Sequence, residues 1–116
     1  MTTWVPSWRS RGAALAVILG MTGGVAAATR GQLYPVSQRD QAFRPGQLAI
    51  QHGDTVQIVN DDGDLLHHSY IESKQFNYDS GDQEPGSRVD VVFSVSGTFT
   101  VLCGIHPRMK LLVHVQ

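Results

Sequence analysis

Two candidate strands flank a short loop in the stretch Thr98-Phe-Thr-Val-Leu-Cys-Gly-Ile-His-Pro-Arg-Met-Lys-Leu-Leu-Val-His-Val115. In the first strand, Phe99, Val101 and Cys103 recur at every second position, which places them on one face. Cys103 is therefore expected at the end of a strand, with its side chain among the core residues. Residues 110–115 predict a second strand that closes the domain.

The residues before this stretch continue the pattern of short strands separated by turns. From Val89 to Val95, apolar and polar side chains alternate with period two, except at Val92. Three further candidate strands are shorter or less regular, at 48–50, 55–60 and 67–72. Residues 74–87 contain Asn, Asp, Gly and Pro, which predict a long irregular loop. Together these signals predict an all-β sandwich or barrel.

Three residues of the loop combine in the pattern Cys-x2-His-x2-Met, formed by Cys103, His106 and Met109. Thiolate and thioether are soft ligands that favour Cu(I), and imidazole also suits Cu(II). Electron-transfer copper sites use two His and one Cys with a weak axial Met. The pair His67-His68 offers the missing histidine, so the sequence predicts a mononuclear copper site.

Other interpretations of these residues fit less well. A single buried Cys is usually structural, but the fixed spacing to His106 and Met109 argues against that role. Zinc binds Cys and His but rarely a thioether. The acidic residues at 61, 62 and 64 lack the spacing and closing Glu of an EF-hand, so a solvated turn is expected there. No G-x-S-x-G motif is present, and we do not expect an enzyme.

The sequence resembles the cupredoxins, especially the small plastocyanin- and amicyanin-like members. The similar segments are Phe43-Arg-Pro-Gly, Gly53-Asp-Thr-Val-Gln-Ile-Val-Asn60, His67-His-Ser-Tyr, Pro85-Gly86, Phe93-Ser-Val-Ser-Gly-Thr-Phe99, the Cys103 loop and Val113-His-Val. The resemblance implies a Greek-key β-sandwich that holds one copper ion, cycling between Cu(I) and Cu(II) in one-electron transfer. The short gap between His106 and Met109 is most similar to amicyanin-like proteins.

The family pattern His-Asn-Val-(Tyr/Val/Phe) aligns with this sequence in two ways. One alignment makes His67 the ligand and puts His68 in place of the Asn. A shift by one residue makes His68 the ligand and Ser69 the small polar residue that braces the loop. We prefer His67 and keep His68 as the alternative.

The resemblance also implies a route for electrons. In this family, the histidine of the C-terminal loop has a solvent-facing edge, which corresponds to His106 here. An apolar patch around it, formed by Ile105, Pro107 and the pair Leu65-Leu66, would suit transient docking of redox proteins. The alternative function is a copper carrier that delivers the ion to an oxidase, for which a more open site rich in Met or His is expected.

The N-terminus has the pattern of a secretory signal peptide. Arg9 and Arg11 precede an apolar stretch at 12–25, and Ala26 to Ala28 supply small residues for cleavage. We therefore expect a signal peptide at 1–28 and one domain at 29–116. The mature protein would be a monomer, periplasmic or otherwise exported, without stable membrane insertion.

Charge and cysteine content argue against a nucleic-acid-binding protein and against a disulfide-bonded one. The chain has nine basic and ten acidic residues, and removal of Arg9 and Arg11 leaves seven basic residues against ten acidic ones. A net negative domain does not suit nucleic acid, which selects a basic surface. Cys103 is the single cysteine, so an intramolecular disulfide is excluded.

Overall fold

The computed structural model describes residues 31–116, so the expected signal peptide at 1–28 lies outside the described residues. This part of the chain forms strands β1 (Leu33–Arg39), β2 (Ala42–Arg44), β3 (Gln47–Ile50), β4 (Thr55–Asn60), β5 (Ser69–Ile71), β6 (Tyr78–Asp79), β7 (Arg88–Val92), β8 (Gly97–Cys103) and β9 (Lys110–Val115). Within residues 31–116, no helix is long and apolar enough to cross a membrane.

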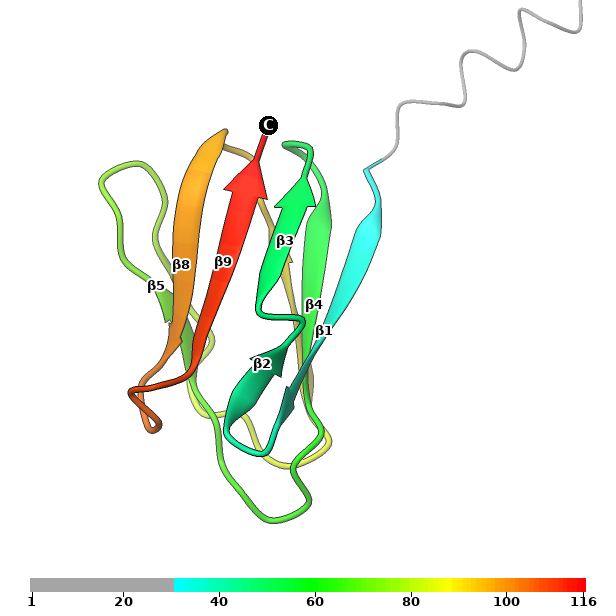
Figure 1. The fold of residues 1–116 in the computed structure, drawn as a ribbon, viewed down its shortest axis with the longest axis vertical. Coiled ribbons are helices and arrows are strands. Elements are labelled where there is room, and N and C mark those ends of the chain that lie inside the picture. The colour runs from blue at the N-terminus through cyan, green and yellow to red at the C-terminus, as the bar shows by residue number, and fades with distance from the viewer. Residues whose placement is uncertain (1–30) are drawn as a thin grey trace, which may run out of the picture. The chain divides into compact units, whose positions relative to one another are not determined.

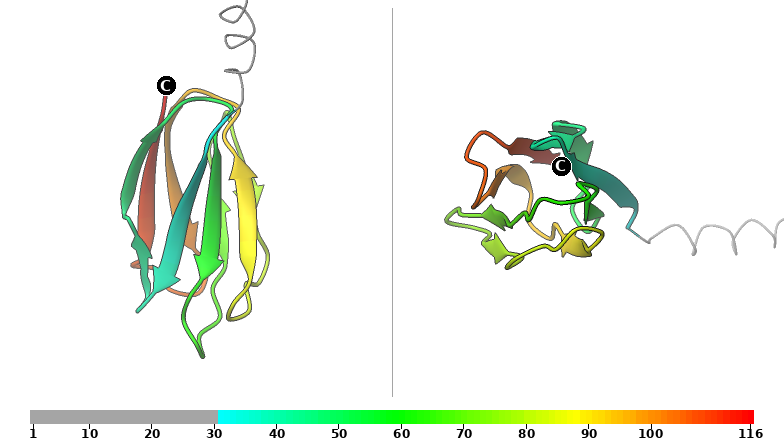
Figure 2. Two further views of the ribbon diagram at one scale, coloured as in Figure 1. Left: turned by 90° about the vertical axis from the view of Figure 1, so that its right-hand side faces the viewer. Right: turned by 90° about the horizontal axis from the view of Figure 1, so that it is seen from below.

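The strands form two sheets that face each other (Figure 1, Figure 2). One sheet has four strands in the order β2-β1-β4-β7, and the other has five in the order β3-β9-β8-β5-β6. Two neighbouring pairs are parallel, β1 with β4 and β3 with β9, and the remaining pairs are antiparallel. The expected all-β sandwich is confirmed.

Alternation along the strands builds the core between the sheets. In β4 and β9, every second side chain is buried, so one face of each strand packs inward. Phe93 and Phe99 contribute the large side chains, with Phe76 packed against both rings at centroid distances of 5.3 and 5.5 Å. Burial of this apolar face supplies most of the driving force for folding.

Most of the predicted strands match the structure closely. The bounds expected for β4 and β9 are confirmed, and β8 begins one residue early, at Gly97. Strand β7 ends at Val92, but the expected alternation continues to Val95, and Val92 is 53% exposed, as its place in the pattern requires. The candidate strand at 67–72 shortens to β5, in which Ser69 and Ile71 are buried.

Two expectations were wrong or incomplete. The segment 74–87 is not irregular throughout, because it contains β6, which pairs with β5, and a bridge between Gln83 and His67. Strands β1 and β2 were not predicted. They form a hairpin through Asp40 and Gln41, both with positive φ (54° and 55°), as a two-residue hairpin turn of type I′ requires.

Three loops meet at one end of the sandwich. They connect β4 to β5, β6 to β7 and β8 to β9, and the β1–β2 hairpin turn lies at the same end (Figure 1). The bridge between His67 and Gln83 joins the first two of these loops, with backbone hydrogen bonds of 3.1 and 2.7 Å. The predicted ligands lie on the first and third.

Candidate metal centre

The register of β5 against β8 decides which histidine faces inward. Ser69 pairs with Cys103, and both side chains are buried on the inner face. The pairing continues outward, where the Gly104 N–H donates to the carbonyl of His68 at 2.8 Å. Because side chains alternate along extended backbone, His67 shares the face of Ser69, and His68 points the other way.

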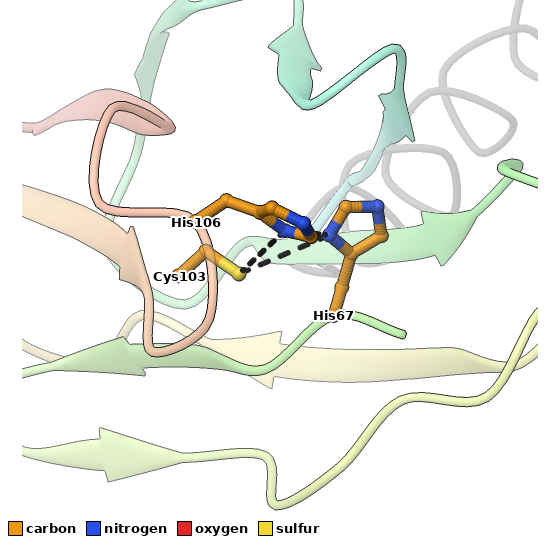
Figure 3. Close-up of side chains that lie close together, drawn as sticks. All are labelled: His67, Cys103 and His106. Carbon is orange, nitrogen blue, oxygen red and sulfur yellow. Dashed lines mark hydrogen bonds between the residues drawn. The ribbon is translucent and has the colours of Figure 1, made fainter. Parts of the chain in front are cut away.

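His67, Cys103 and His106 converge on one point (Figure 3). The Cys103 Sγ atom lies 3.8 Å from His67 Nδ1 and 3.7 Å from His106 Nδ1, and the two Nδ1 atoms are 3.2 Å apart. His67 is fully buried and Cys103 is 3% exposed, whereas His106 is half-buried. The structure thus brings together one sulfur and two ring nitrogens.

His68 lies outside this cluster. Its Nε2 atom is 2.6 Å from Asp79 Oδ1, and its Nδ1 atom is 3.6 Å from Asp82 Oδ1, on the partly exposed side of the β5–β6 hairpin. The pKa of Asp79 is lowered below 3.8, because the Gly81 N–H and the His68 ring both form hydrogen bonds with its carboxylate. Both ring nitrogens of His68 therefore face carboxylates, away from Cys103.

Asp62 lies behind His67 and corrects the expectation of a solvated turn. Asp61 and Asp64 are exposed, but Asp62 is buried, with Oδ2 at 2.6 Å from His67 Nε2. Burial alone would raise the pKa of Asp62. Hydrogen bonds from His67 and from the Asp40 N–H (2.8 Å) outweigh it, and the pKa falls below 3.8. No sequence pattern indicates this role, because acidic residues around a Gly are typical of a solvated turn.

Asn60 braces the loop that carries His67. Its side-chain amide donates to the carbonyls of Leu65 (2.8 Å) and Gln83 (2.9 Å), and its Oδ1 accepts from the Asp62 N–H at 3.0 Å. Asn60 is fully buried. One side chain thus ties the loop before His67 to the neighbouring loop that carries Gln83, the bridge partner of His67.

A buried polar network underlies the site and was not expected from the sequence. Gln38, Ser69 and Gln83 are buried and share hydrogen bonds of 2.5 to 3.0 Å. Ser69 is the cross-strand partner of Cys103, and Gln83 is the bridge partner of His67. The network therefore ties β1 to the two positions that hold the inward-facing histidine and cysteine.

The remaining residues singled out from the sequence are Met109 and those around His106. Met109 directly precedes β9 and is 1% exposed, and its N–H donates to the His106 carbonyl at 3.0 Å. A shallow hollow of about 360 Å³ is lined by Gln41, His106, Pro107 and Arg108. Ile105 is 41% exposed, whereas Leu65 and Leu66 are half-buried.

Comparison with solved structures finds several proteins with a similar fold. A copper-containing nitrite reductase from Thermus scotoductus SA-01 matches with a TM-score of 0.65 and 28% identity, over 72% of this chain and 22% of that chain. A purple cupredoxin from Nitrosopumilus maritimus matches with a TM-score of 0.63 and 23% identity, over 72% and 99%. A reduced amicyanin variant matches with a TM-score of 0.67 and 20% identity, over 78% and 89%. The chain has the cupredoxin fold.

No protein-family model matches the sequence, and no curated protein matches it. The chain spans about a fifth of the nitrite reductase, so this similarity concerns one part of that enzyme. The amicyanin and purple cupredoxin structures confirm the cupredoxin fold expected from the sequence. This chain covers 99% of the purple cupredoxin chain and 89% of the amicyanin chain. In this chain, the three converging side chains lie at the loop end of the sandwich.

Proposed function

We propose that this protein is an electron carrier with one copper ion held by His67, Cys103, His106 and, weakly, Met109. The observation that carries the proposal is the convergence of Cys103 Sγ and the two Nδ1 atoms in a buried cluster. Copper bound there would supply one-electron exchange between Cu(I) and Cu(II). The amicyanin and purple cupredoxin neighbours support this class of function.

The geometry of the three donor atoms fits a transition-metal ion. The distances of 3.2, 3.7 and 3.8 Å define a triangle whose centre lies about 2.1 Å from each corner. Zinc, for comparison, forms bonds of about 2.0–2.1 Å with imidazole and about 2.3 Å with thiolate. A thiolate with two imidazoles matches the trigonal set of electron-transfer copper sites. Met109, buried on the same loop, supplies the soft thioether that zinc rarely takes.

Burial favours a resident ion over one that is delivered to another protein. His67 is fully buried and Cys103 is almost so, and both are fixed by strand pairing or by the His67–Gln83 bridge. A site held by strand pairing and by this bridge changes little between oxidation states, which lowers the cost of electron transfer. A copper carrier would need to open this site to release the ion.

The half-buried ring of His106 is the proposed exit for electrons. The hollow beside it is bordered by the polar Gln41 and Arg108 as well as by Pro107, and Ile105 and Pro107 are exposed apolar residues next to the ring. A surface of this kind suits brief encounters with redox proteins. We place the mature protein in the periplasm or outside the cell, as a monomer, which agrees with the signal peptide expected at 1–28.

Redox cycling with metal analysis tests the function. The protein is loaded with Cu(II), reduced and reoxidised several times, and its copper content is measured after each desalting step. An electron carrier keeps one copper per chain, and its spectrum returns after each cycle. Loss of copper on reduction, or its transfer to a Cu(I) chelator of moderate affinity, would instead indicate a carrier of copper.

A further inference from the structure

Asp62 is the one acidic side chain of its loop that the fold buries. Asp61 and Asp64 are exposed, whereas Asp62 is only 8% exposed. A carboxylate loses much solvation when it is buried, so burial persists only where hydrogen bonds or opposite charges compensate. The contacts of Asp62 show what compensates here.

Both oxygens of the Asp62 carboxylate have partners. Oδ1 accepts a hydrogen bond from the Asp40 N–H at 2.8 Å, and Oδ2 lies 2.6 Å from Nε2 of His67. The Asp62 N–H is itself held by Asn60 at 3.0 Å. Positions on β1–β2, on β4 and on the His67 loop therefore fix the carboxylate in place.

This contact determines where His67 carries its proton. An ionised carboxylate only accepts hydrogen bonds, so the Nε2 atom that faces it must be protonated. In the neutral imidazole, the Nδ1 atom then has a free lone pair, and it is this atom that faces Cys103 and His106. A neutral imidazole with its lone pair directed at the site is the form that binds metals.

The other imidazole of the cluster lacks this support. Within residues 31–116, the carboxylate pairs of histidine involve His67 and His68, and none involves His106. The hydrogen-bond contacts of His106 Nδ1 are with Cys103 and His67. The two histidines of the site thus differ in kind, one fixed from behind by a buried anion and one bordering the surface.

We propose that Asp62 is a positioning residue that selects the Nε2–H tautomer of His67, holds its ring, and favours the oxidised state of the metal through its negative charge. The effect on the oxidised state rests on the proposed copper site, whereas the tautomer belongs to the protein itself. A buried anion behind one ligand increases the basicity of that ligand. It stabilises Cu(II) more than Cu(I), because the charge on the ion is larger.

Two measurements test this inference separately from the proposed function. Nitrogen-15 NMR of the metal-free protein identifies the His67 tautomer, and we expect Nε2–H in the wild type. Asp62→Asn removes the charge with little change in shape, and Asp64→Asn makes the same change at an exposed position of the same loop. In the copper form, Asp62→Asn should weaken Cu(II) binding about tenfold more than Cu(I) binding, which raises the reduction potential by about 59 mV.

The outcomes separate clearly. An Nδ1–H tautomer in the metal-free wild type would overturn the inference, as would equal potentials for Asp62→Asn and Asp64→Asn. A higher potential in Asp62→Asn alone would support it. If the wild type forms no copper–thiolate chromophore, the proposed function fails, and the NMR result still decides whether Asp62 sets the tautomer of His67.

Discussion

The Nδ1 atom of His67 lies 3.8 Å from the Sγ atom of Cys103, although 36 residues separate them in the chain. Strand pairing produces this proximity, because β5 lies antiparallel to β8 with Ser69 opposite Cys103. A shift of that register by one residue would turn His68 inward and His67 outward. The proposed ligand set therefore depends on one strand pairing, and substitutions at the two histidines test it directly.

His67→Gln and His68→Gln form a matched pair, since the same change is made at adjacent positions. We expect His67→Gln to weaken copper binding by more than about 100-fold, because even outer partners of metal ligands contribute about 10–100-fold. His68→Gln should bind copper like the wild type, since its ring faces Asp79. Titration with Cu(II) measures both, and the reverse result would make His68 the ligand.

Met109→Leu tests the proposed axial ligand. The exchange conserves volume at a buried position, so it should change the free energy of unfolding by less than about 1.5 kcal/mol. We expect copper to be retained and the reduction potential to rise, because a weaker axial ligand favours Cu(I). Voltammetry measures the potential, with Leu111→Met as a buried control near the loop. An unchanged potential in Met109→Leu would exclude Met109 as a ligand.

Asn60→Ala tests the brace behind the His67 loop. The change removes three hydrogen bonds with backbone groups, each with a net contribution of about 1 kcal/mol, so we expect a loss of about 3 kcal/mol in stability. Urea unfolding measures it. Gln57→Ala, which removes one exposed side-chain hydrogen bond with Asp90, is the control and should cost less than about 1 kcal/mol. Equal losses in the two variants would contradict the role of Asn60.

The carboxyl titration of Asp79 tests the outward position of His68. The lowered pKa of Asp79 means that its bonds with Gly81 and His68 stabilise the fold above pH 3.8, and that this contribution is lost as the pH falls through the lowered value. In His68→Ala, we expect the pKa of Asp79 to rise but to stay below 3.8, because the Gly81 N–H remains. Carbon-13 NMR of the carboxyl group measures it, and an unchanged pKa would show that His68 makes no such contact.

The parts of the fold that the sequence predicted are those whose alternation is local. In β4, β8 and β9, apolar residues recur with period two, and the structure buries the expected face. Strand β1 was missed because its pairing with β4 is parallel and its buried residues include the polar Gln38. No sequence pattern near Gln38 predicts that its amide donates a hydrogen bond to Gln83, 45 residues later.

The candidate site shows the same division. Cys103, His106 and Met109 are close in sequence, so their spacing alone indicated the loop. The choice between His67 and His68 required the register against β8, which no local pattern contains. The polar neighbours of Asp62 predict a solvated turn. Its burial results from contacts with His67 and with Asp40 of the β1–β2 hairpin, and the sequence did not predict that hairpin.

The most direct test of the copper–thiolate centre is the visible absorption spectrum of the purified protein after addition of Cu(II), with Cys103→Ser as the control. We predict an intense blue band in the wild type that reductant bleaches and oxidant restores, and no such band in Cys103→Ser, because a hydroxyl cannot replace the thiolate. A wild-type protein that stays colourless with Cu(II), or a band that survives in Cys103→Ser, would contradict a copper centre built on Cys103.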